Sequence, residues 1–131
     1  MKADIWGPAG WLFLHSITLN YPENPTQLDK DNYSVFFASI QNTLPCEKCK
    51  EHYKNNIYEN PIRLNSREDL VKWLIEIHNE VNKNNNKPIF TYDMFIDKYS
   101  KIYDDNDHGI DKLLLLVIII IFFLLILYAS S

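Results

Sequence analysis

Apolar residues recur at helical spacing through the first hundred positions of the chain, between short breaks rich in proline and asparagine. Residues 9–19, 31–43 and 46–57 each carry one apolar face, and "YPENPT" and Pro45 separate them. No alternating strand pattern and no internal repeat is evident in the sequence. The pattern therefore predicts an all-α domain built as a small helical bundle.

Residues 65–83 form the strongest helical pattern of the chain. Asn65 or Ser66 can cap this helix, and acidic residues fill its first turn, where the helix dipole favours them. One apolar stripe runs along it, made of Leu70, Trp73, Leu74, Ile77, His78 and Val81. We expect this helix to be the central scaffold of a four-helix bundle.

A short fifth helix is predicted at residues 92–103, after Pro88 has ended the fourth. The residues expected to face inward from it are Phe95, Tyr99 and Ile102.

The C-terminal pattern is different, because residues 113–129 form an uninterrupted apolar run. As a helix this run is roughly 25 Å long, which suits a thin bilayer. A buried core helix or an oligomer seam would keep some polar face, so we predict a transmembrane helix. The predicted organisation is a domain at 1–103, a polar linker at 104–112 and a membrane anchor at 113–129.

The position of this run predicts a tail anchor. The early apolar stretch "IWGPAGWLFLH" contains a proline, two glycines and a histidine, which is unlike a signal peptide. A span close to the end of a chain is inserted after translation, so we expect the helical domain to face the cytosol.

Composition adds two exclusions. The chain has 131 residues, 47% hydrophobic and 23% charged, which matches one globular domain. Its net charge of -4 provides no basic field for phosphate, so nucleic acid is not an expected partner. With only two cysteines, the core must be held by packing rather than by several disulfides.

Both cysteines lie in "LPCEKCKEHY", as Cys46 and Cys49. At the start of a helix they lie one turn apart on one face, and the unpaired N–H groups there stabilise a thiolate. Such a pair cycles readily between dithiol and disulfide. The βαβ context of thioredoxin is missing, so another kind of redox protein is indicated.

Three other interpretations of the cysteines stay open. Zinc could use Cys46, Cys49 and His52, but a structural zinc site needs four ligands and no second pair follows. The pair could be inert, although the flanking Pro, Glu and Lys residues indicate that it is exposed. The domain could also be a tail-anchored adaptor without catalysis. The histidines that could complete a zinc site are His15, His78 and His108.

Catalysis by a dithiol needs an organic cofactor to pass electrons onward. Two stretches could hold one, because Trp11 and His15 share one helix face, and Trp73 shares another with His78 and Asn82. Stacking and amide hydrogen bonds suit a flat heteroaromatic ring. From periodicity alone, ordinary core packing explains these residues at least as well as a cofactor site does.

Three motifs in order carry a resemblance to a known family. They are "WGPAGWLFLH", "LPCEKC" and "HNEVNKNNNKP". Together they resemble the FAD-linked sulfhydryl oxidases of the Erv/ALR family, in particular the branch found in large cytoplasmic DNA viruses.

The resemblance implies a thiol oxidase that converts protein dithiols to disulfides and passes electrons through FAD to O2, giving hydrogen peroxide. It implies that Cys46 exchanges with substrate and that Cys49 faces the flavin. From its place one turn after Cys49, His52 either helps to hold a thiolate or is a surface histidine without a role. The residues that it implies as FAD contacts are Trp11, His15, Trp73, His78, Asn79, Asn82, Lys87, Lys98 and Tyr99.

The sequence departs from the family pattern at several positions. Ile75 and Tyr92 stand where many members have a structural disulfide, and Pro8 stands where an arginine is common. No third cysteine can shuttle electrons, so the expected partner is a thioredoxin-like or CxxC protein that reacts directly. The resemblance also implies a homodimer, and a viral protein of this kind is expected at a host or virion membrane.

Overall fold

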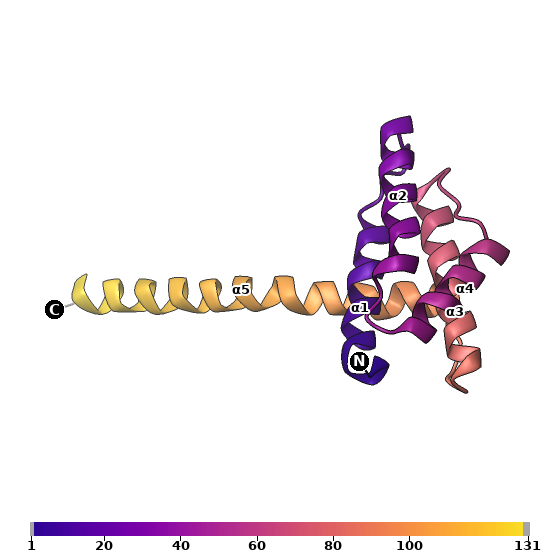
Figure 1. Cartoon of the computed structure of the whole chain (residues 1–131). Helices are drawn as coiled ribbons and strands as arrows, with labels where there is room; N and C mark the ends of the chain where they lie inside the picture. Colours follow the sequence, from indigo (N-terminus) through magenta and orange to yellow (C-terminus); the bar gives the residue numbers. More distant parts are fainter. Residues whose placement is uncertain (1, 130–131) are drawn as a thin grey trace. The chain divides into compact units, whose positions relative to one another are not determined.

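Five α-helices make up the part of the chain that the structure describes (Figure 1). The computed structural model describes the backbone of residues 2–129 and the side chains of residues 2–104 and 114–129. The helices are α1 (Ala3–Leu19), α2 (Gln27–Thr43), α3 (Glu47–Glu59), α4 (Arg67–Asn84) and α5 (Tyr92–Ala129). The predicted all-α class is confirmed. The chain divides into two compact units, Met1–Tyr92 and Asp93–Ser131.

The helix starts follow from local capping. Thr26 and Asp29 form a capping box at α2, and the Ser66 hydroxyl accepts the Asp69 N–H at α4. Helix α1 begins earlier than predicted, at Ala3, and contains Pro8. Proline removes one helical N–H donor there, and the helix continues through it.

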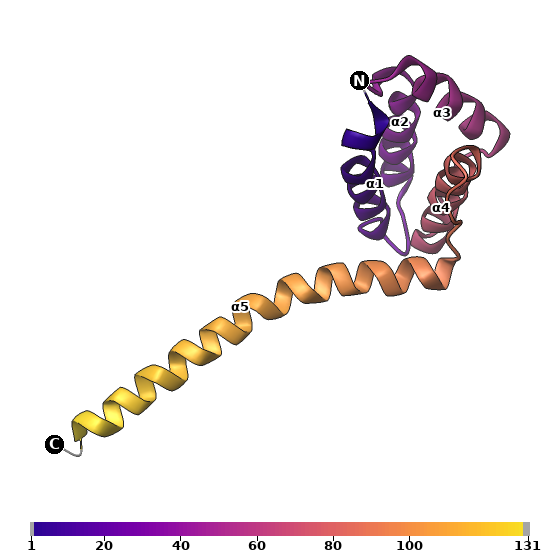
Figure 2. The ribbon, with the colours of Figure 1, turned by 90° about the horizontal axis from the view of Figure 1, so that it is seen from below.

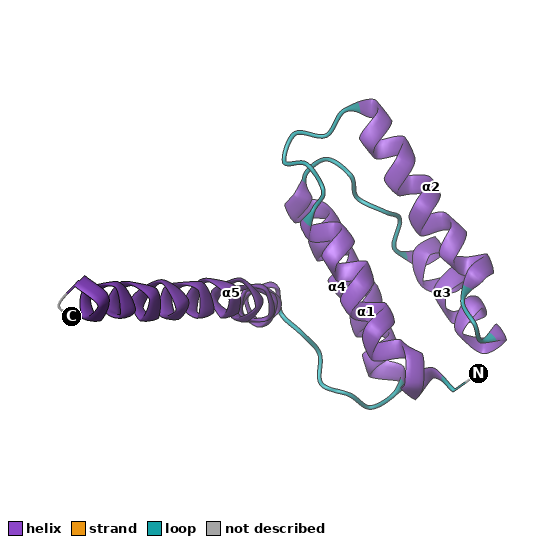
Figure 3. Cartoon of the chain, turned by 90° about the vertical axis from the view of Figure 1, so that its left-hand side faces the viewer, coloured by secondary structure: helices purple, strands orange, loops and turns teal. Residues whose placement is uncertain are grey.

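In the first unit, α4 packs against both α1 and α3, and α2 packs against α3 (Figure 3). The expected scaffold role of α4 is confirmed. Trp73 of α4 is 1% exposed, its indole N–H donates to the Asn60 carbonyl at 2.8 Å, and its ring meets Phe37 edge-on at 5.1 Å. The buried cluster consists of Tyr21, Phe37, Ile40, Tyr53, Leu70, Trp73, Leu74 and Ile77.

Side-chain contacts hold α4 within the first unit. Ile75 is buried, and Lys72 lies over the Tyr92 ring at 5.2 Å from its centroid. At the start of α4, Arg67 donates to the Tyr21 carbonyl at 2.6 Å and pairs with Glu23 at 2.9 Å. These contacts tie α4 to the loop after α1 and to the beginning of α5.

Helix α5 differs from the prediction. The sequence predicted a short helix at 92–103, a polar linker at 104–112 and an apolar segment at 113–129, whereas the structure has one helix over all three (Figure 2). No proline interrupts this stretch, so the backbone can continue its hydrogen bonding. Within α5, the Phe95 and Tyr99 rings stack at 4.3 Å.

Within the residues whose side chains are described, no helix is both long and apolar enough to span a membrane. This does not support the transmembrane helix predicted at 113–129. The described side chains of that run are those of 114–129, a stretch shorter than the ~20 residues of a typical span.

Candidate active site

The two cysteines meet at the start of α3. Pro45 favours extended backbone at Leu44, which has φ -55° and ψ 139° and ends α2. Cys46 then caps α3, and its Sγ accepts the backbone N–H of Cys49 at 3.3 Å. Both thiols are free and half-buried. The prediction that the pair opens a helix, one turn apart, is confirmed.

The surroundings of the two thiols push their pKa values apart. Hydrogen bonds from the Cys49 side chain and from the Cys49 backbone N–H hold the pKa of the Cys46 thiol below its ordinary value. Burial, aided by the bond to Cys46 and by its charge, raises the pKa of Cys49 to about 11. Of the two thiols, Cys46 is therefore the one that loses its proton more readily.

A second cluster forms where α1 contacts α4. Trp11 and His78 stack with centroids 3.8 Å apart and planes 7° apart. His15, 1% exposed, lies with its Nε2 at 3.0 Å from Nδ1 of His78. One of these nitrogens donates and the other accepts. The structure therefore brings together residues that the sequence placed in two separate motifs.

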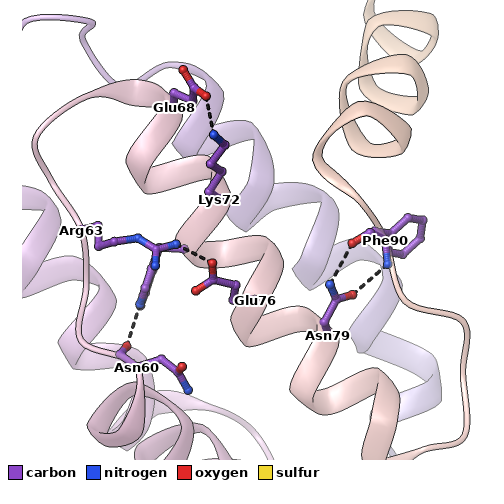
Figure 4. Close-up of polar contacts among 8 residues, drawn as sticks. Asn60, Arg63, Glu68, Lys72, Glu76, Asn79 and Phe90 are labelled. Carbon is purple, nitrogen blue, oxygen red and sulfur yellow. Dashed lines mark hydrogen bonds and ion pairs between the residues drawn. The ribbon is translucent and has the colours of Figure 1, made fainter.

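The 85–91 loop is fastened to α4 by two asparagines that were predicted as cofactor contacts. The Asn79 amide donates to the Phe90 carbonyl at 2.8 Å and accepts the Phe90 N–H at 2.9 Å (Figure 4). The Asn82 side-chain amide donates to the Pro88 carbonyl at 3.1 Å. The backbone carbonyl of Asn82 accepts the Lys87 N–H at 2.9 Å. Both side chains position this loop.

The remaining predicted cofactor residues lie in three places. Trp73 is in the core, as described above, and Lys87 is exposed on the 85–91 loop. Lys98 and Tyr99 lie on α5, in the second unit. The residues of the candidate site lie in the first unit, so the roles of Lys98 and Tyr99 at the site stay predictions.

Sequence reasoning missed three residues. The Phe90 ring lies 5.7 Å from that of His78, and its place just after Lys87 and Pro88 was the available signal. The indole N–H of Trp6 and the Asn56 Nδ2 are buried without a hydrogen-bond partner. Leaving such a donor unpaired costs about 1–3 kcal/mol, so a ligand that accepts these bonds would stabilise the fold.

The described residues suit FAD, which presents fused aromatic rings, many acceptor atoms and an anionic diphosphate. The rings of Trp11 and His78 offer aromatic surface, and Trp6 and Asn56 offer buried donors. Lys87 supplies a positive charge on the adjacent loop.

A metal site is not indicated in the described part of the chain. Among the residues whose side chains are described, no group of three or more His, Cys, Asp and Glu residues is placed to hold a metal ion. His108, one of the histidines considered for zinc, lies outside those residues.

The Erv1 / Alr family profile matches residues 8–101. The chain belongs to this family. It is 43% identical over 104 residues to a probable FAD-linked sulfhydryl oxidase of Acanthamoeba polyphaga mimivirus, which covers 77% of this chain and 73% of the relative. The corresponding protein of African swine fever virus is 31% identical over 99 residues, covering 76% and 80%.

Cellular members are similar over the same region. The Arabidopsis thaliana ERV1 oxidase is 32% identical over 101 residues, and the match spans 52% of that longer protein. The fold resembles the FAD-binding domain of Saccharomyces cerevisiae Erv1, with a TM-score of 0.67 and 35% identity over 70% of this chain and 87% of that one. The resemblance inferred from three motifs is confirmed, and with it the class of FAD-linked sulfhydryl oxidase and the cofactor FAD.

Proposed function

We propose that this protein oxidises dithiols of partner proteins to disulfides, with O2 as the final acceptor and hydrogen peroxide as the product. The observation that carries the proposal is the cysteine pair at the start of α3, in which the surroundings lower the pKa of Cys46 and raise that of Cys49. Family membership supplies the context in which such a pair is catalytic.

The cycle begins with Cys46 and Cys49 joined as a disulfide. A substrate thiolate attacks Cys46 Sγ, the bond between the cysteines breaks, and Cys49 leaves and takes up a proton. The second substrate thiolate then attacks the substrate sulfur of the mixed disulfide, and Cys46 leaves as a thiolate. Its lowered pKa makes it a good leaving group for this step.

When bound, FAD would supply the acceptor for the two electrons of the reduced pair and the route by which they reach O2. The rings of Trp11, His15 and His78 would hold the cofactor. Lys87, nine residues after His78 in the sequence, would supply a positive charge. Asn79 and Asn82 contribute by fixing the loop that carries Lys87. These assignments rest on the α1–α4 contact and on the loop geometry.

The substrate is proposed to be a small thioredoxin-like or CxxC protein. The chain has no cysteine beyond Cys46 and Cys49, so the partner's sulfur must reach Cys46 directly. The half-buried but accessible position of Cys46 supports such an approach.

A homodimer is also proposed. Helices α1 and α2 leave several large apolar side chains exposed, and Phe13 meets Phe36 edge-on at 6.5 Å, so the two helices share an apolar surface. Sedimentation of the whole chain tests this, because a monomer at micromolar concentration would contradict it. The exposed residues are Ile5, Leu12, Phe13, Leu28 and Val35.

The location is a proposal based on sequence alone: attachment to a host or virion membrane, with the helical unit in the cytosol. Fractionation of cells that produce the whole chain or a chain without 113–129 tests it. Equal recovery of both chains in the soluble fraction would exclude attachment through that segment.

The activity is tested by the visible spectrum of the purified whole chain and by oxygen uptake with dithiothreitol. We expect a flavin spectrum, and uptake that Cys49→Ala abolishes while the flavin stays bound. A colourless, folded protein would contradict the proposal and favour a non-catalytic adaptor.

A further inference from the structure

Asn56 has a buried amide that the protein does not use. The residue is 8% exposed, and its Nδ2 has no hydrogen-bond partner. Tyr53, the other buried residue of α3, differs in this respect, because its hydroxyl donates to the Phe37 carbonyl at 3.0 Å. Buried amide donors are nearly always paired in folded proteins, so the unpaired Nδ2 calls for an acceptor from outside the chain.

The position of Asn56 links this donor to the redox site. It follows Cys49 by seven residues and Tyr53 by three, so the three side chains share one face of α3. Along the helix axis Asn56 is about 10 Å from Cys49. A cofactor that receives electrons from Cys49 and extends about 10 Å along this face would reach the unpaired donor.

The neighbouring pocket does not account for Asn56. A pocket beside α3 is lined by Ser34, Phe37, Ala38, Ile57, Ile62 and Trp73, and Asn56 is not among them. These residues are mostly apolar, so a ligand in that pocket would offer little reason for a buried amide.

We propose that Asn56 is a cofactor-binding residue whose Nδ2 donates a hydrogen bond to FAD. The inference rests on the proposed function, since it needs FAD to be bound against α3. FAD is rich in oxygen and nitrogen acceptors, which is the chemistry that an unpaired N–H requires. Asn56 belongs to none of the three motifs that indicated the family, so the assignment comes from burial and placement.

The test compares Asn56→Leu with Asn55→Leu in the whole chain, purified with FAD. Both variants replace an asparagine of α3 by leucine, but Asn55 is exposed. Two quantities are measured: the rate at which FAD is released on dilution, followed by flavin fluorescence, and the rise in Tm when FAD is added. For Asn56→Leu we expect release about tenfold faster and a smaller FAD-dependent rise in Tm, because one bond to the ligand is lost. Asn55→Leu should match the wild type in both.

The Tm of the proteins after their FAD has been removed separates this role from a structural one. Removing an unpaired donor should leave that Tm unchanged or raise it, while FAD is held more weakly. Wild-type FAD release and an unchanged FAD-dependent rise would overturn the inference. If Asn56→Leu does not fold, Asn56→Asp, which keeps the shape and removes the N–H donor, is measured in the same way and decides by the same outcomes. A wild type that binds no FAD would contradict the proposed function instead.

Discussion

His15 and His78 are joined side chain to side chain, with Nε2 and Nδ1 3.0 Å apart, across the contact between α1 and α4. His15 is almost completely buried, and His78 lies flat against Trp11. The bond fixes the relative rotation of two helices that belong to separate motifs in the sequence. The aromatic surface proposed to hold FAD therefore depends on this pair.

We expect His78→Phe to destabilise the protein by about 1–3 kcal/mol. Phenylalanine keeps a ring against Trp11 but removes the partner of the buried His15 Nε2. The double variant His15→Leu with His78→Phe should recover part of this loss, because both polar groups are then gone. Denaturant unfolding of the wild type and the two variants measures the change in the free energy of unfolding. A double variant less stable than His78→Phe would contradict the proposed pairing.

The reactivity of the two thiols should differ with pH. Since the pKa of Cys46 is lowered, the reduced protein should react with iodoacetamide at Cys46 at a lower pH than an ordinary thiol does. Cys49, with its pKa raised to about 11, should be labelled only in strongly alkaline buffer. Peptide mass spectrometry across a pH series identifies the labelled residue.

Cys49→Ala provides the matched control for that series. It removes the thiol that donates to Cys46, so the pKa of Cys46 should rise and its labelling should shift to higher pH. Labelling that starts at Cys49 in the wild type, or an unshifted Cys46 in the variant, would contradict the assignment of charge.

Asn79→Ala should free the 85–91 loop. The variant loses two hydrogen bonds to the backbone of Phe90, worth about 1–2 kcal/mol together. We expect faster hydrogen exchange at the Phe90 amide and faster release of FAD. Asn82→Ala should have a smaller effect, because it loses one side-chain bond and keeps the backbone bond from Lys87. Equal exchange at Phe90 in Asn79→Ala and the wild type would contradict this role.

Much of the architecture could be predicted from the sequence, because capping residues and apolar stripes act locally. Ser66 and the stripe on α4 defined that helix, and Pro45 placed Cys46 at the start of α3. The extent of α5 could not be predicted in this way. The polar stretch after Tyr103 has linker composition, yet it contains no residue that must break a helix.

The candidate site was only partly predictable, for a different reason. The motifs identified Trp11, His15 and His78, because rings on a helix face are visible in the sequence. They did not show whether an amide would bind a cofactor or the backbone, which depends on where a distant loop lies. The structure shows that Asn79 and Asn82 hold the loop and that the unpaired amide belongs to Asn56, while the cofactor contacts of Asn79 and Asn82 stay predictions.

Trp73 illustrates the same distinction and gives a further prediction. Its contact with FAD stays a prediction, and the structure shows its ring in the core and its N–H donating to the Asn60 carbonyl. We expect Trp73→Phe to lower the free energy of unfolding by about 1–3 kcal/mol through the lost bond and volume. FAD release measured well below the Tm should stay near the wild-type rate. Much faster release at an unchanged Tm would instead support direct contact with the cofactor.

The turn after α4 offers a test of what sets the direction of the 85–91 loop. Asn86 has φ 52°, in the left-handed region, and its N–H donates to the Lys83 carbonyl at 3.1 Å. Asn86→Ala should cost about 1 kcal/mol, because the short polar side chain of asparagine makes the left-handed region more favourable than the methyl group of alanine does. Asn86→Gly should be neutral or stabilising, since glycine adopts positive φ freely. Asn84→Ala, at the last residue of α4, is the control and should not destabilise, because alanine favours helix. Denaturant unfolding measures all three, and a loss for Asn86→Gly as large as for Asn86→Ala would show that the asparagine side chain, rather than its backbone angle, fixes the turn that leads to Lys87.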